Sequence, residues 1–172
     1  MPTRIDLTTL SLQDALDLAA AIEEEAYKRY TLFATQLGRG GGGAGSFFAS
    51  MADNEKKHGE KLSDRRTAMF GDAPARVSLA DLFDVEAPEV GAPRRSMSLL
   101  QAYELAKSSE QKAYDFYDQA LPNITDPDVR TLFVELRDEE TEHVRMIEDA
   151  IAKLPANANI ELDFDIDESP AL

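Results

Sequence analysis

Only two histidines occur in this chain of 172 residues, and each follows a glutamate by three positions. The pairs are Glu55 with His58 and Glu140 with His143. On a helix, side chains three positions apart point the same way. A carboxylate beside an imidazole supplies oxygen and nitrogen donors for a metal ion. A single pair of this kind is usually solvated, but the occurrence of both histidines in such pairs predicts a metal site.

Two further segments repeat the pattern Glu-x-x-Ala-x-x-x-Tyr, beginning at Glu23 and at Glu110. One Glu from each of two helices and Glu-x-x-His from each of two others form the ligand set of di-metal carboxylate bundles. The predicted ligands are Glu23, Glu55, His58, Glu110, Glu140 and His143. Tyr30 and Tyr117 lie two helical turns beyond their glutamates. Each is either a core aromatic or a donor of its O–H to a metal-bound carboxylate.

Charge explains why these residue types belong together. A buried carboxylate costs several kcal/mol unless it is paired or bound to a cation. Four carboxylates neutralise two divalent ions, and two imidazoles leave coordination positions open for small oxygen ligands. Other acids lie off these faces and are expected in solvent, with a supporting role beside the ligands as the alternative. They are Glu24, Glu25, Glu139 and Glu142.

Hydrophobic periodicity predicts four amphipathic helices that would position these groups. They are expected at 11–37, 46–70, 98–122 and 126–154. The first, third and fourth of these helices begin with capping signals. The second is expected to end at Gly71. The apolar face of the second helix is expected to include Phe48, Leu62 and Met69. The capping residues are Ser11 with Asp14, Ser98 with Gln101, and Asp126 before Pro127.

The connections complete an all-α four-helix bundle. The glycine-rich stretch 38–45 is predicted to be a flexible link, since glycine disfavours helix. Residues 71–97 are predicted to form a long crossover with one helical turn near 78–83, which lets the third helix run parallel to the second. We expect a bundle domain at 1–154 and an acidic tail at 155–172. The tail could add a strand, pack on a partner or stay disordered.

Composition narrows the classes of partner. The net charge of −15 argues against nucleic acid and anionic membrane surfaces and favours, to a smaller degree, attraction of cations. No apolar run is long enough to span a membrane, and the first ten residues do not resemble a secretory signal. We therefore expect a cytoplasmic protein. The absence of cysteine excludes disulfides, cysteine-ligated zinc and iron–sulfur or rubredoxin centres from this chain.

Four segments together resemble the rubrerythrin branch of the ferritin-like superfamily: EEEAYKRY (23–30), NEKKHGEKL (54–62), EQKAYDFY (110–117) and EETEHVRMI (139–147). The resemblance implies a ferritin-like bundle with a non-haem di-iron site on the six ligands above. Zinc or manganese are alternative metals. It also implies reaction with hydrogen peroxide or dioxygen, and a homodimer or higher homo-oligomer, in some cases with exchanged helices.

Two departures from that family pattern qualify the expected activity. Without a rubredoxin centre, turnover needs an external electron donor. Ala113 stands where many relatives carry an extra glutamate, so the resemblance does not imply a mechanism in which iron moves between ligands. The leading hypothesis is a di-iron oxidoreductase of the peroxide reductase or ferroxidase type. The alternatives are an iron-binding, storage or metal-handling protein with little turnover, and a structural bundle with a vestigial site.

Overall fold

The computed structural model describes residues 6–38, 43–78 and 97–160. Every regular element in these ranges is a helix, which confirms the predicted all-α fold. In chain order the elements are η1 (Leu7–Thr9), α1 (Leu12–Gly38), α2 (Gly43–Phe70), α3 (Leu99–Ala120), η3 (Leu121–Asn123) and α4 (Pro127–Ile151).

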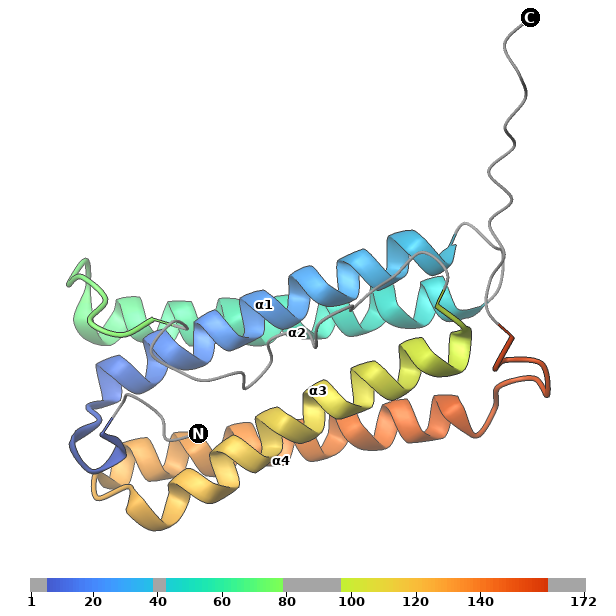
Figure 1. The fold of residues 1–172 in the computed structure, drawn as a ribbon. Coiled ribbons are helices and arrows are strands. Elements are labelled where there is room, and N and C mark those ends of the chain that lie inside the picture. The colour runs from blue at the N-terminus through green and yellow to red at the C-terminus, as the bar shows by residue number, and fades with distance from the viewer. Residues whose placement is uncertain (1–5, 39–42, 79–96, 161–172) are drawn as a thin grey trace, which may run out of the picture.

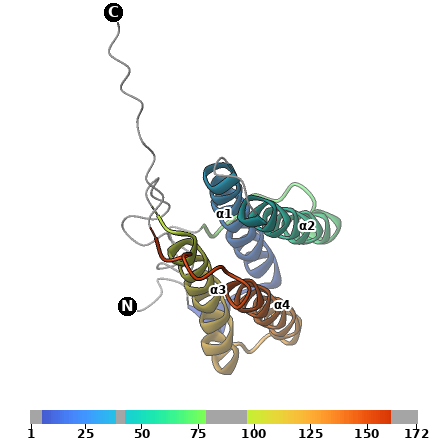
Figure 2. The same ribbon diagram turned by 90° about the vertical axis from the view of Figure 1, so that its right-hand side faces the viewer.

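The four long helices form two hairpins, α1 with α2 and α3 with α4 (Figure 1). Viewed along the helices, one hairpin lies above the other (Figure 2). Helices α2 and α3 run in the same direction (Figure 1), so the chain must traverse the length of the bundle between Phe70 and Leu99. This confirms the ferritin-like topology with a long crossover. The helical turn predicted near 78–83 lies almost entirely outside the described residues.

Side chains at the helix starts satisfy backbone N–H groups that have no partner within the helix. At α3, Ser98 N–H donates to Gln101 Oε1 at 2.9 Å, and Gln101 N–H donates to Ser98 Oγ at 3.1 Å. Ser11 and Asp14 exchange the same pair of bonds at α1, at 3.3 and 3.2 Å. The Asp126 carboxylate accepts bonds from the first turn of α4. The capping signals in the sequence therefore identified three helix starts correctly.

The glycine-rich link is shorter than predicted. Helix α1 continues to Gly38 and α2 begins at Gly43, so the prediction that 38–45 is non-helical was wrong at both ends. A Cβ added to Gly45 would lie 2.6 Å from the Cα of Gly38. Glycine therefore permits a close approach of the two helices, and tertiary packing outweighs its intrinsic helix penalty of about 1 kcal/mol.

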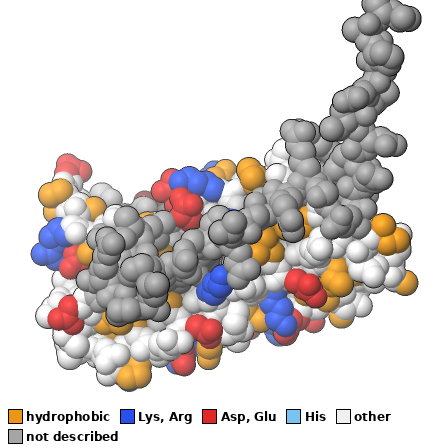
Figure 3. Space-filling view, viewed as in Figure 1, with side chains coloured by type: hydrophobic (Ala, Val, Ile, Leu, Met, Phe, Trp, Pro, Cys, Tyr) orange, Lys and Arg blue, Asp and Glu red, His pale blue; other side chains and the backbone are white. Residues whose placement is uncertain are grey.

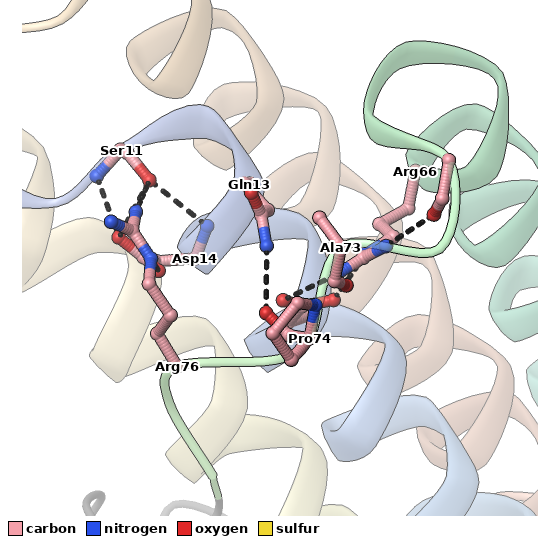
Figure 4. A network of polar contacts seen from close by, with 9 residues as sticks. Ser11, Gln13, Asp14, Arg66, Ala73, Pro74 and Arg76 are labelled. Carbon is pink, nitrogen blue, oxygen red and sulfur yellow. Dashed lines mark hydrogen bonds and ion pairs between the residues drawn. The ribbon is translucent and has the colours of Figure 1, made fainter.

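Two arginines, Arg66 near the end of α2 and Arg76 beyond it, donate hydrogen bonds to the start of α1 (Figure 4). Arg76 Nε donates to Asp14 Oδ1 at 3.0 Å, and Arg66 Nε donates to Asp17 Oδ1 at 2.7 Å. Arg66 also donates to the carbonyl of Gly71, whose φ of 57° ends the helix as predicted. These bonds hold the first described residues after α2 against α1.

The C-terminal ends of α2 and α4 differ from the predictions. Met69, predicted on the apolar face of α2, is 52% exposed, because the buried positions of that helix end at Leu62. Helix α4 ends at Ile151, slightly before the predicted Leu154. Beyond it, Ala158 is buried and its carbonyl accepts a bond from Leu100 N–H at 2.9 Å. Most of the predicted tail lies outside the described residues.

Acidic and basic side chains are interspersed over the face shown in Figure 3. None of the described helices is both long and apolar enough to cross a bilayer.

Candidate metal centre

The six predicted ligands lie in one layer at the middle of the bundle, where charge replaces apolar packing. Hydrophobic residues form one cluster on each side of this layer. In α1 the clusters are separated at Glu23, between Ile22 and Ala26, and in α3 at Glu110, between Ala106 and Ala113. The layer therefore interrupts what would otherwise be a continuous core.

Burial of the layer is nearly complete. The exposed fraction is 3% or less for five of the six residues, namely Glu23, Glu55, Glu110, Glu140 and His143. His58 is more accessible, with 19% of its side chain exposed. Buried charged groups at this density are tolerated only when they are paired or bound to cations.

Three carboxylates surround His143. Its Nδ1 lies 3.2 Å from Glu55 Oε1, 3.2 Å from Glu110 Oε2 and 3.5 Å from Glu140 Oε2. These contacts join α4 to α2 and α3. Donor atoms of Glu110, Glu140 and His143 lie within 4.8 Å of one another, which is close enough to bind one metal ion.

His58 faces a second group of carboxylates. Its Nδ1 lies 3.9 Å from Glu23 Oε2 and 3.8 Å from Glu139 Oε2. These three residues form another cluster whose donor atoms lie within 4.8 Å of one another. Glu55 also groups with both histidines, which places its carboxylate between the two halves of the layer.

The two imidazoles have pKa values displaced in opposite directions. Burial, together with the positive charges of nearby His143 and Lys61, lowers the pKa of His58 to about 4. Burial also acts to lower the pKa of His143, but its hydrogen bond to Glu110 and the charge of Glu55 outweigh that effect and raise the pKa to about 9. At neutral pH without metal, His58 is therefore an open nitrogen donor and His143 carries a proton.

Tyr30 and Tyr117 are both fully buried beside this layer. Tyr30 Oη donates a hydrogen bond to Glu110 Oε1 and so connects α1 to a predicted ligand on α3. Tyr117 packs edge-on against Phe133, with ring centroids 5.2 Å apart. Ala113 is buried in the apolar cluster.

Metal cations fit this donor set. His58 Nδ1 is buried and makes no hydrogen bond within the described part of the chain. Glu55 Oε1 makes none there either, although it lies at ion-pair distance from His143. Buried polar atoms without such partners are uncommon and call for a bound ion or water. Hard carboxylate oxygens with imidazole nitrogens suit divalent iron, manganese or zinc.

A groove of about 440 Å³ between α1 and α2 reaches Glu23 and Glu55 from solvent. Small residues, Ala20, Ala21 and Gly59, form part of its wall. Its other acidic lining residues are Asp17, Glu24, Glu60 and Asp64, with Lys56 as the basic one. The groove can admit a cation or a small oxidant to the buried carboxylates.

Glu139 lies closer to the predicted ligands than its position in the sequence led us to expect. It was expected in solvent with Glu24, Glu25 and Glu142. Those three pair with Lys28 or Arg145 at the surface, but Glu139 is half-buried and faces His58. The available signal was its position four residues before His143, which places it beside the same helix face.

Comparison with known proteins places this bundle in a family. The rubrerythrin family model matches residues 14–151. The chain belongs to the rubrerythrin family. A crystal structure of an uncharacterized conserved protein from Magnetospirillum magnetotacticum MS-1 is similar to this rubrerythrin-family chain at 27% identity, with a TM-score of 0.70. The alignment covers 85% of this chain and 97% of that one. A search of curated proteins found no match.

Proposed function

We propose that this rubrerythrin-family protein is a non-haem di-iron oxidoreductase that reacts with hydrogen peroxide or dioxygen. The observation that supports the proposal is the buried layer of four glutamates and two histidines, contributed by all four helices. Two iron ions bound there would supply the two electrons that, with two protons, convert hydrogen peroxide into two molecules of water.

The chain's own residues prepare the site for that reaction. His58 is neutral above about pH 4 and offers its nitrogen without first losing a proton. Tyr30 holds the Glu110 carboxylate by its hydrogen bond and so limits the orientations of a ligand. The four carboxylates would offset the charge of two divalent cations, and their attraction for the cations would be stronger for an oxidised, more highly charged pair.

Repeated turnover would need a path for the oxidant to the metal centre and a source of electrons to reduce the metal ions again. The groove between α1 and α2, with a volume of about 440 Å³, has room for peroxide or dioxygen beside Glu23 and Glu55. Because the chain has no cysteine, electrons for repeated turnover would come from a separate donor protein or reductant.

The alternative is an iron-binding protein with little turnover. The acidic lining of the groove favours it, because carboxylates leading from solvent to buried ligands concentrate cations at the opening. One site can both take up and oxidise iron, so the rate of peroxide or dioxygen consumption must distinguish an enzyme from a metal-handling protein.

Stopped-flow oxidation of anaerobically loaded protein tests the proposal. We expect two ferrous ions per chain, oxidised by about one equivalent of peroxide, faster than free ferrous iron. Glu55→Ala and His143→Ala should lose metal binding and the fast phase, whereas the surface variant Glu142→Gln should keep both. Iron uptake without peroxide or dioxygen consumption would support the alternative. Undiminished metal binding in both alanine variants would exclude this layer as the site.

A further inference from the structure

A seventh carboxylate lies beside the predicted ligands. Glu139 on α4 and Glu23 on α1 approach the same nitrogen, His58 Nδ1, from two helices, at 3.8 and 3.9 Å. Ligand atoms about 2 Å from one metal ion lie about 3–4 Å from each other. The three side chains are therefore already spaced to bind a single cation with little movement.

The surroundings of Glu139 differ from those of its neighbours on α4. Glu142 is 60% exposed and pairs with Arg145 at 2.5 Å, and Glu135 is 57% exposed and pairs with Arg65 at 3.5 Å. The side chain of Glu139 is 39% exposed, and the described residues offer it no lysine or arginine at ion-pair distance. The side chain that it faces is the imidazole of His58, a predicted ligand, at 3.8 Å.

Glu139 is half-buried beside the His58 imidazole, so its carboxylate has lost part of its contact with water. A carboxylate held partly out of water without a cationic partner gains more from binding a metal ion than a solvated one does.

From this geometry we propose that Glu139 is a further metal ligand, binding the ion that Glu23 and His58 hold. The inference rests on the proposed di-metal function. It makes the two halves of the layer unequal, since the half at His58 has a ligand at the bundle surface and the half at His143 is wholly buried. A fifth carboxylate exceeds the charge of two divalent ions by one, and so favours a more highly charged oxidised pair.

Cobalt(II) titration of the full-length apoprotein tests this assignment without requiring activity. Isothermal calorimetry counts and ranks the sites, and the visible d–d bands report coordination. Glu139→Gln keeps the size of the side chain and removes the anionic ligand. Glu142→Gln is its matched control, because it removes the same charge from the same helix away from the site. Glu23→Gln is the reference for loss of a ligand from the same half.

We expect wild-type protein to bind two cobalt ions. In Glu139→Gln the affinity for one of the two cobalt ions should fall about ten- to a hundredfold, and the d–d bands of that ion should change. The affinity for the other ion should stay the same. Glu142→Gln should stay within about twofold of wild type. Circular dichroism of the Glu139→Gln and Glu142→Gln apoproteins should match that of wild type, since neither side chain is in the core.

The outcomes separate this inference from the function on which it rests. If Glu23→Gln weakens one site while Glu139→Gln behaves like Glu142→Gln, Glu139 is not a ligand and the di-metal proposal stands. If the wild-type chain binds fewer than two ions, the di-metal proposal itself fails, and the assignment of Glu139 fails with it.

Discussion

The imidazole rings of His58 and His143 lie almost parallel, with centroids 5.4 Å apart and planes inclined by 10°. They come from α2 and α4, which belong to different hairpins. Despite this proximity, their pKa values are about 4 and about 9, because three carboxylates surround His143 whereas His58 is desolvated next to positive groups. The pair therefore makes the metal-free protein sensitive to pH in two separate ranges.

The stability of the apoprotein should be greatest near pH 6.5, the pKa of histidine in an unfolded chain. His143 has a raised folded pKa, so its contribution is complete below about pH 6.5 and is lost as pH rises through 9. That loss is on the order of 3 kcal/mol in the free energy of unfolding. His58 has a lowered folded pKa, so its contribution is present above about pH 6.5 and is lost as pH falls towards 4.

Urea unfolding of chelator-treated protein at a series of pH values measures both limbs. His143→Gln should flatten the alkaline limb and His58→Gln the acidic limb. A wild-type profile that stays level between pH 6.5 and 9 would contradict the protonated state assigned to His143.

Metal affinity should depend on pH differently in the two halves of the centre. Binding at His143 must displace a proton below pH 9, so affinity should rise by about tenfold per pH unit up to that value and then level off. Binding at His58 needs no deprotonation of the imidazole above about pH 4. Zinc titrations between pH 6 and 8, in buffers of different ionisation enthalpy, should show about one proton released from His143. Equal pH dependence at both sites would disprove the asymmetry.

Tyr30→Phe should weaken the metal centre without removing a ligand. It deletes the hydrogen bond to Glu110 and leaves a buried carboxylate oxygen with one donor fewer. We expect about 2 kcal/mol lower stability of the apoprotein and about tenfold weaker metal binding. Tyr114→Phe, on a half-buried position of α3, is the control and should change neither by a comparable amount. Unfolding curves and metal competition measure the two effects.

Gly45→Ala should destabilise the hairpin of α1 and α2. The added Cβ would meet the backbone of Gly38 at 2.6 Å, and backbone cannot give way as a flexible side chain can. We expect a loss of about 1–3 kcal/mol in the free energy of unfolding. Gly43→Ala is matched in chemistry, but its Cβ would meet nothing within 4 Å, so it should be neutral or up to about 1 kcal/mol more stable. Equal thermal melting of the two variants would show that the close contact does not matter.

Local signals in the sequence predicted the helices well where a named side chain acts on its own neighbours. Ser98 with Gln101 and Asp126 before Pro127 marked helix starts because capping depends on residues within one turn. The same reasoning failed at Gly43 to Gly45 and at Met69. The first depends on contact with α1, and the second on where burial of α2 ends.

The candidate ligands were predictable for a related reason. Glu-x-x-His and Glu-x-x-Ala-x-x-x-Tyr place their groups on one face of any helix, so spacing alone selected six residues that the fold brings into one layer. Glu139 was not chosen in this way, because it lies outside both repeated patterns. Its position four residues before His143 was a weaker signal, and packing separates it clearly from its acidic neighbours Glu135 and Glu142.

The amino-acid sequence by itself determined the helices, their caps and the residue types of the centre, since these follow from interactions within a few positions of the chain. Only the tertiary structure decided which helix faces meet. It brings Tyr30 to Glu110 across two hairpins, sets the opposite pKa displacements of the two histidines, and turns Glu139 towards His58. The physical reason is that desolvation and charge–charge interaction depend on distance in space, which residues far apart in sequence acquire only on folding.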